Sequence, residues 1–412
     1  MAKPDIKLTT SGYEFYWIDG QITIEISRIH THMDGKITGE IFIRNGTKAL
    51  RPPSQINFTA DRTRDTLVKS LSTTYPDKAE WRRIIDELCY HVLDLTRKGE
   101  PIIEAWSGED VEPPQYILYP FIIKNYPSII FGDPGTIKST MALLFSQIMM
   151  LPWKDNPLEI PCPDRPLKVL YLDWETDLAT IKWQLTKLER GRGMGLNACM
   201  VYYRLCSLPL ANDIEELRKR IAELNVDVII IDSLGLATGG ELKEAGPAIS
   251  FFSALRQLVT TSLILAHSPK DSENVKNKSI YGTVFFQAQA RNIWEIKKSQ
   301  EPGSSKADIA LYHKKPAPFQ SYHSPIGFSL EYTDDSIVIC KNDPTTVPDL
   351  LERMGVQVQI TKYMEGKSGT VSPSDIAENV GMPLKNVNKA LNDMKAKGRA
   401  VNVSWGQWGL PL

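Results

Sequence analysis

The sequence predicts an α/β protein built on a parallel β-sheet core, with a small α+β domain before the core and a compact helical domain after it. Between residues 112 and 342, short apolar segments of strand length alternate with longer segments of helical periodicity. Such alternation is typical of a parallel sheet covered by helices. Residues 1–108 instead show strand-like alternation with Asp-Gly turns, and residues 350–412 show closely spaced helical patterns.

Composition limits the possible classes of protein. The 412 residues are 42% hydrophobic and 24% charged, with a formal net charge of −1. These values fit a globular protein with a sizeable core and no overall basic field, so any nucleic-acid contact must come from local patches. The five cysteines form no C-x-x-C pair, which favours reduced structural thiols. Because no long apolar segment is present, we expect a cytoplasmic protein that makes no membrane contact.

The first region predicts strands and helices but contains no chemical motif. Its strand patterns cover 13–18, 21–29 and 36–44, and its helical patterns cover 60–73 and 78–98. We therefore expect an accessory domain.

The middle region supplies the strands and helices of the expected parallel sheet. A late segment, 326–340, is expected to extend the sheet with antiparallel strands, and polar stretches at 238–247, 270–281 and 299–307 are expected to be loops. The predicted strands are 128–132, 168–173, 201–205, 228–232, 262–266, 290–296 and 309–312, and the predicted helices are 139–150, 178–190 and 214–224.

A glycine-rich turn between the first of these strands and the helix after it predicts a phosphate-binding loop. Such a turn directs backbone N–H groups inward, and the helix N-terminus adds positive potential. Lys138 would reach the β- and γ-phosphates, and the Ser139 hydroxyl would bind Mg²⁺. The expected nucleotide-binding residues are Gly132, Asp133, Pro134, Gly135, Thr136, Ile137, Lys138, Ser139 and Thr140.

One position departs from the G-x-x-x-x-G-K-[ST] pattern, because Ile137 stands where glycine is expected. An isoleucine still offers its backbone N–H, but branching at Cβ restricts its backbone angles. This departure bears on the rate of ATP turnover more than on phosphate binding. The alternative interpretation is a strand, turn and helix without a ligand.

Two later strands end in carboxylates at the edge where ligands bind parallel sheets. Glu175 is the candidate that orients or deprotonates an attacking water, with Asp173 and Asp177 as competing candidates. Asp232 ends the strand 228–232 and would hold Mg²⁺ through water, opposite Ser139. A solvated acidic loop is the alternative for 173–177.

A histidine closes a third strand close to these carboxylates. His267 ends the strand that begins at 262, where it could sense a γ-phosphate and relay its presence to 270–281. A structural histidine is the alternative.

Together these segments resemble the RecA/DnaB superfamily of P-loop ATPases, and most of all the plasmid RepA-type hexameric replicative helicases with their phage and mobile-element relatives. The resemblance is carried by GDPGTIKST, YLDWET, VIIIDSLG and LAHSPK, with a fifth segment at 282–294, and it covers about 115–330. It implies a RecA-like fold, ATP and Mg²⁺ as cofactors, and a homo-oligomer, expected to be a hexamer. It also implies catalytic roles for Lys138, Glu175 and His267. Arg291 falls in the segment that supplies an arginine finger to a neighbouring subunit.

Rings of this type bind single-stranded DNA with loops that face the central channel. Here the resemblance places those loops at 239–246 and 271–282. The second loop has Lys276 and Lys278 for phosphate contact and Tyr281 as a stacking platform. Two solvated loops are the alternative.

The last region looks like a winged helix-turn-helix. Helical patterns at 358–365, 374–380 and 384–397 precede a short strand pair within 400–408, and Ser372 or Ser374 suits a helix N-cap. Residues 351–412 contain eight Lys and Arg against five Asp and Glu. Lys385 and Lys389 are the candidates for contact with duplex DNA, and a domain that contacts protein is the alternative.

The sequence therefore favours an ATP-dependent DNA motor, a helicase or translocase in the replication of a plasmid, phage or other mobile element. One alternative is a DNA-binding ATPase that does not unwind, such as a recombination mediator, a regulator or a defence component. The other is a DNA-binding protein that does not hydrolyse ATP.

Overall fold

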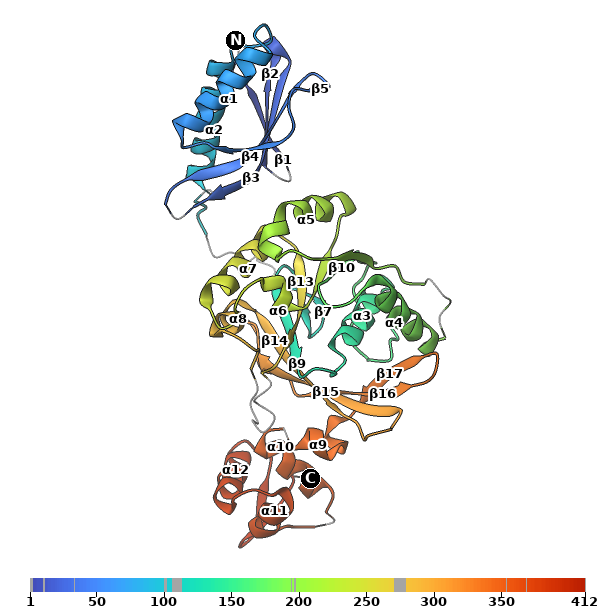
Figure 1. Ribbon diagram of the computed structural model, residues 1–412. Helices are drawn as coiled ribbons and strands as arrows, with labels where there is room; N and C mark the ends of the chain where they lie inside the picture. The colour runs from blue at the N-terminus through green and yellow to red at the C-terminus, as the bar shows by residue number, and fades with distance from the viewer. Residues whose placement is uncertain are drawn as a thin grey trace. The chain divides into compact units, whose positions relative to one another are not determined.

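The computed structural model of the protein describes residues 3–9, 12–32, 34–99, 102–105, 113–193, 195, 198–269, 279–352, 354–367 and 369–411. They form two compact units, one of Met1–Pro113 with Asn212–Asn225 and the other of Pro114–Ala211 with Val226–Leu412 (Figure 1). Among these residues, every helix is too short or too polar to span a lipid bilayer.

The first unit contains an antiparallel sheet with two helices packed on its apolar face. Alternate residues of β3 and β4, such as Ile24 and Ile41, are buried against Ile84 and Leu88 of α2. The predicted strands and helices of this region are confirmed. β1 was not predicted, because its mostly exposed side chains leave no apolar alternation. The elements are β1 (Asp5–Thr9), β2 (Gly12–Trp17), β3 (Ile22–Thr31), β4 (Ile37–Asn45), β5 (Lys48–Ala49), β6 (Ser54–Asn57), α1 (Asp61–Thr74) and α2 (Trp81–Lys98).

Nine strands of the described chain form the main sheet, in the order β11-β10-β12-β13-β9-β14-β15-β16-β17. The strands from β11 to β14 are parallel, and β14 to β17 are antiparallel, so the antiparallel extension predicted from the sequence is confirmed. The strands are β9 (Pro127–Gly132), β10 (Val169–Asp173), β11 (Tyr202–Leu205), β12 (Val228–Asp232), β13 (Thr261–His267), β14 (Asn292–Ser299), β15 (Lys306–Lys315), β16 (Ile326–Tyr332) and β17 (Ile337–Asn342).

Helices cover both faces of this sheet. Figure 1 shows α3 and α4 on one side of it and α6, α7 and α8 on the other. Residues of even number on β9, β12 and β14, such as Ile130, Ile230 and Trp294, are buried with α3 in one apolar cluster. The strand order and the crossover helices make this an α/β core of the RecA type. The helices of this unit are α3 (Lys138–Met150), α4 (Leu178–Gly191), α6 (Leu234–Thr238), α7 (Ala245–Gln257) and α8 (Val284–Gln289), and a small pair, β7 (Tyr116–Leu118) and β8 (Ile122–Ile123), precedes the sheet. Most of α5 (Leu210–Leu224) is assigned to the first unit.

Residues 239–244 of the predicted loop at 238–247 connect α6 to α7, and the two ends of the predicted stretch belong to these helices. Gly239 takes the left-handed conformation that ends α6, and α7 begins at Ala245. The Leu242 carbonyl accepts a 2.7 Å hydrogen bond from the N–H of Thr283. The segment 239–246 is therefore held between two helices and by Leu242, which leaves few residues that could extend toward DNA.

The C-terminal part forms three helices and a two-stranded hairpin around a small apolar core. Ser372 caps α11 in a capping box with Asp375, as one of the two predicted N-cap residues. Val387 and Leu391 of α12 are buried in this core beside Trp408 of the hairpin. The elements are α10 (Val356–Glu365), α11 (Pro373–Val380), α12 (Leu384–Ala396), β18 (Val401–Ser404) and β19 (Gln407–Gly409), and the short α9 (Pro348–Leu351) precedes them and packs in a separate cluster with Tyr312.

Candidate nucleotide site

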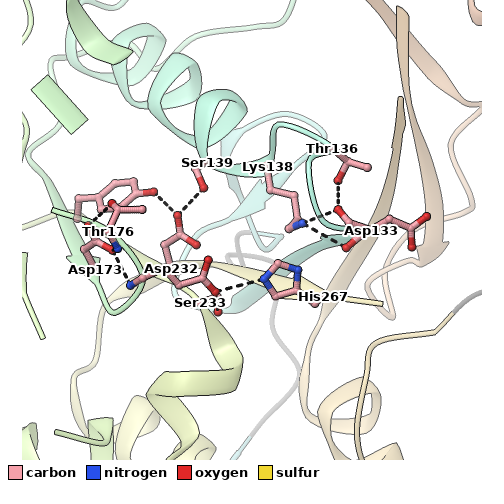
Figure 2. Close-up of polar contacts among 12 residues, drawn as sticks. Asp133, Thr136, Lys138, Ser139, Asp173, Thr176, Asp232, Ser233 and His267 are labelled. Atoms are coloured by element: carbon pink, nitrogen blue, oxygen red, sulfur yellow. Dashed lines mark hydrogen bonds and ion pairs between the residues drawn. The ribbon is translucent and has the colours of Figure 1, made fainter. Parts of the chain in front are cut away.

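The predicted phosphate-binding loop connects the end of β9 to the start of α3, at the carboxyl edge of the parallel strands (Figure 2). Gly132 must lack a side chain, because a Cβ atom there would lie 2.5 Å from the Ile296 carbonyl oxygen of β14. Gly135 has a φ of +77°, in the region that glycine adopts without strain. The turn therefore lies directly against the neighbouring strand.

Ile137 takes the backbone conformation that glycine would supply at its position. It is the N-cap of α3, with φ 57° and ψ 28° in the left-handed region. A β-branched residue in that region is strained by about 1–2 kcal/mol. The chain thus keeps the path of a phosphate-binding loop despite the departure in sequence.

Lys138 opens α3 and turns back over the loop. Its Nζ donates hydrogen bonds to the carbonyl oxygens of Gly132, at 3.2 Å, and Asp133, at 2.9 Å. Burial lowers the pKa of Lys138, while Asp232, Glu175 and Asp133 act in the opposite direction. The ammonium group therefore lies among three carboxylates and the loop carbonyls.

Ser139 and Asp232 face one another across the edge of the sheet, as Figure 2 shows. The Ser139 hydroxyl donates to Asp232 Oδ2 at 2.6 Å, and the Tyr171 hydroxyl donates to the same oxygen at 2.5 Å. Burial raises the pKa of Asp232, although both hydroxyl groups oppose that rise. A serine hydroxyl beside a carboxylate is the oxygen donor set that Mg²⁺ prefers, so these residues fit the ion that accompanies a nucleotide.

The structure separates the three competing carboxylates that follow β10. Asp173 is fully buried and accepts hydrogen bonds from the N–H of Glu175 and of Thr176, the Thr176 hydroxyl and the Tyr203 hydroxyl, at 2.7–3.0 Å. Asp177 caps α4 by accepting from the N–H of Thr180 at 2.8 Å. Both side chains therefore shape the backbone around Glu175.

Glu175 is the carboxylate that remains directed at the site. Its Oε1 accepts a hydrogen bond from the Ser233 hydroxyl and lies 3.2 Å from Nε2 of His267. The hydrogen bond with His267 lowers the pKa of Glu175, and Ser233 and Lys138 lower it further. Glu175 is therefore ionised at neutral pH, the state that a general base requires.

Substitution tests the separate role of Asp173. Asp173→Ala is expected to lower the free energy of unfolding by about 2–4 kcal/mol, because several buried donors lose their acceptor. Asp177→Ala should cost about 1 kcal/mol, the usual value of an N-cap. Urea unfolding measures the loss of stability in each variant. Equal losses would contradict the assignment of Asp173 as the main support of the backbone around Glu175.

Arg291 does not reach the phosphate-binding loop of its own chain. Its N–H donates to the carbonyl of Pro127, the first residue of β9, at 3.0 Å, and its side chain is exposed. Lys138 follows the other end of the same strand, roughly 20 Å away at about 3.3 Å per residue. A role for Arg291 at this site can therefore come only from a second copy, and that role stays a prediction.

Of the predicted DNA-binding residues, Tyr281 lies at this edge, and the others lie on α12 or outside the described chain. Lys276 and Lys278 fall outside the described residues. Tyr281 is exposed, and its N–H donates to the carbonyl of His267 at 2.9 Å. Lys385 and Lys389 are exposed on α12, on the side away from its buried residues.

Sequence reasoning missed two partners at the nucleotide site. Tyr171 precedes Asp173 by two residues on β10, so both side chains point to the same face of the sheet. Ser233 directly follows Asp232 and stands at the N-cap position of α6, where its hydroxyl donates to Glu175 and not to the helix. Position within the strand could have indicated Tyr171, whereas nothing in the sequence indicated the contact between Ser233 and Glu175.

Comparison with known proteins agrees with this geometry. Residues 98–273 match the family model described as AAA domain. The chain contains a P-loop NTPase domain. The match covers the loop, Glu175, Asp232 and His267, and it ends before Arg291. Such a domain implies a nucleotide, with Mg²⁺ as its companion ion.

Two further comparisons do not identify a family for the chain. No curated protein matches it. Among solved structures, it is similar to a KaiC-like protein of the hyperthermophilic archaeon Pyrococcus horikoshii OT3, at 13% identity and a TM-score of 0.37, over 54% of this chain and 93% of that one.

Proposed function

We propose that the protein is an oligomeric, ATP-hydrolysing DNA motor. The observation that carries the proposal is the place of Glu175, ionised beside Ser233 and His267 at the sheet edge that also bears Lys138, Ser139 and Asp232. A general base, a cation and a Mg²⁺-binding pair at one edge are what phosphoryl transfer to water requires.

Each residue has a distinct role in the proposed reaction. Lys138 would exchange its carbonyl partners for the β- and γ-phosphates, and Ser139 with Asp232 would hold Mg²⁺, which when bound supplies positive charge beside the phosphates. Glu175 accepts the proton of the attacking water. His267 and Ser233 orient the Glu175 carboxylate through their hydrogen bonds, so that it need not reorganise during reaction.

The oligomer, expected to be a hexamer, enters the proposal through Arg291. Its exposed side chain, at the opposite edge of the sheet, is free to enter the nucleotide site of a second copy. An arginine there would stabilise the charge that develops in phosphoryl transfer and would couple hydrolysis to subunit contact.

Contact with DNA is assigned to two places. Lys276, Lys278 and Tyr281 would hold single-stranded DNA in the channel of the ring. The C-terminal helices and hairpin would act as a winged helix-turn-helix, with exposed Lys385 and Lys389 of α12 on duplex phosphates. The motor would serve as a helicase or translocase in replication of a plasmid, phage or other mobile element.

A DNA-binding ATPase that does not unwind is the second candidate. It predicts hydrolysis stimulated by DNA without strand separation. Ile137 instead favours a third candidate, a DNA-binding protein that does not hydrolyse ATP, because strain in the loop can slow turnover.

The DNA part of the proposal is tested by ATP hydrolysis with and without single-stranded DNA. The wild-type protein is expected to hydrolyse ATP several-fold faster with DNA, as coupling between DNA contact and hydrolysis in a motor implies. Lys385→Ala/Lys389→Ala should weaken duplex binding, whereas Lys48→Ala/Lys69→Ala, which alters two exposed lysines of the first unit, should not.

Two results would count against DNA binding. One is hydrolysis indifferent to DNA of any length, and the other is equal loss of duplex binding in both lysine pairs. Strand separation by the wild-type protein then distinguishes a helicase from the second candidate.

A further inference from the structure

A line of alternating charges runs from β15 to the phosphate-binding loop. The Nζ atom of Lys314 lies 2.8 Å from Glu295 Oε2, and the Nζ atom of Lys297 lies 3.0 Å from Glu295 Oε1. Lys297 Nζ in turn lies 3.3 Å from Asp133 Oδ2. The line ends at the second residue of the loop.

The middle pair of this line is deeply buried. Glu295 is 2% exposed and Lys297 is 5% exposed, both on β14. A buried ion pair contributes little net stability, because desolvation of both charges offsets their attraction. Removal of one partner is costly, since it leaves the other charge buried and unpaired. Stability alone is therefore a weak reason for Lys297 to be present.

Asp133 connects this line to the groups that would hold phosphate. Its carbonyl oxygen accepts from Nζ of Lys138 at 2.9 Å and from the Thr136 hydroxyl at 2.7 Å. Its carboxylate accepts hydrogen bonds from the Ser268 hydroxyl and from Nζ of Lys297. The backbone of Asp133 thus faces Lys138, the phosphate-binding lysine, while its side chain faces Lys297.

A carboxylate within the loop opposes the loop's own function. The phosphates of ATP carry several negative charges, and the Asp133 carboxylate would repel them if Lys297 did not offset its charge. Lys297 neutralises that carboxylate from behind the loop, and Glu295 keeps the ammonium group in place.

We propose that Lys297 is a positioning residue for nucleotide binding, which cancels the charge of Asp133 and fixes the loop in its phosphate-accepting form. The inference rests on the proposed nucleotide at Lys138. It assigns to β14 a part in the site, although Lys297 lies beyond the segment that matches the AAA domain.

Equilibrium binding of a fluorescent ATP analogue to the full-length protein, with Mg²⁺, tests this proposal. Lys297→Met is expected to weaken binding about tenfold, the effect of about 1.4 kcal/mol from one unscreened charge. Asp133→Asn should bind the analogue at least as tightly as wild type. Asp133→Asn/Lys297→Met should recover most of the loss, because the loop carboxylate whose charge Lys297 offsets is then also gone.

The matched control is Lys298→Met, which removes the same charge one residue along β14, on the opposite face of the sheet. It should bind like wild type. Lys297→Arg should keep most of the affinity, and melting curves identify a variant that fails to fold.

Several results would overturn the proposal. If Lys297→Met binds like wild type, or if the double variant binds as poorly as Lys297→Met, charge cancellation is wrong. If Lys297→Met does not fold, tenfold weaker binding by Asp133→Asn contradicts the proposal equally. A wild-type protein that binds no ATP analogue would overturn the proposed function together with this inference.

Discussion

Glu175→Gln is expected to lower kcat for ATP hydrolysis by about 10²- to 10⁴-fold, the usual contribution of a general base. The amide has nearly the same size as the carboxylate and can still accept from Ser233, but it cannot take a proton from water. Affinity for ATP should change little, because Glu175 acts on the attacking water. Steady-state hydrolysis and ATP binding measure the two effects separately.

Asp177→Ala is the matched control for Glu175→Gln, since it removes a carboxylate two residues away that only caps α4. It should keep kcat within a few-fold of wild type. The pH dependence adds a check: because the pKa of Glu175 is lowered, its contribution to the rate is present at neutral pH and is lost only as pH falls through that lowered value. A Glu175→Gln variant with nearly normal kcat would rule out the assigned base.

Asp232→Asn is the second change with a large expected effect. It should weaken the apparent affinity for Mg²⁺ by about 10- to 100-fold, as loss of a group that orients a metal's ligands does. The amide carries no charge for the ion and offers N–H groups toward the hydroxyls of Ser139 and Tyr171. A Mg²⁺ titration of ATP hydrolysis, with Mn²⁺ binding by electron paramagnetic resonance, measures the change.

Stability separates this effect from unfolding. The raised pKa of Asp232 means that burial disfavours its charged form, so the folded protein is less stable above the usual carboxyl pKa than it would be with a neutral group there. Asp232→Asn should therefore melt at or above the wild-type temperature. Tyr171→Phe keeps the carboxylate and should retain most of the Mg²⁺ affinity. Wild-type Mg²⁺ dependence in Asp232→Asn would contradict the assignment.

The fold of the core was predictable because its signals are local. Strand, glycine turn and helix follow one another at 128–150, and buried apolar strands ending in Asp173 and Asp232 show the same layout. By contrast, α7 was missed because Gly246 and Pro247 read as a loop, although proline is tolerated in the first turn of a helix. β1 was missed because it buries too little to show a pattern.

The site was only partly predictable, because tertiary contacts assign its carboxylates. In the sequence, Asp173 and Asp177 compete with Glu175 for the role of the catalytic carboxylate. Only the folded chain shows that Asp173 accepts hydrogen bonds from the backbone after β10 and that Asp177 caps α4. Glu175 is then the carboxylate that faces Ser233 and His267. The partnership of Lys297 with Asp133 joins positions 164 apart in sequence, and no local pattern indicates it.

The most direct test of the central claim is Mg²⁺-dependent ATP hydrolysis by the purified full-length protein beside Lys138→Ala. We expect wild-type turnover that requires Mg²⁺ and is lost in Lys138→Ala, because the cation on the β- and γ-phosphates is then gone. Equal turnover by the two proteins, or none by the wild type at any Mg²⁺ concentration, would contradict the assignment of this edge as an ATPase site.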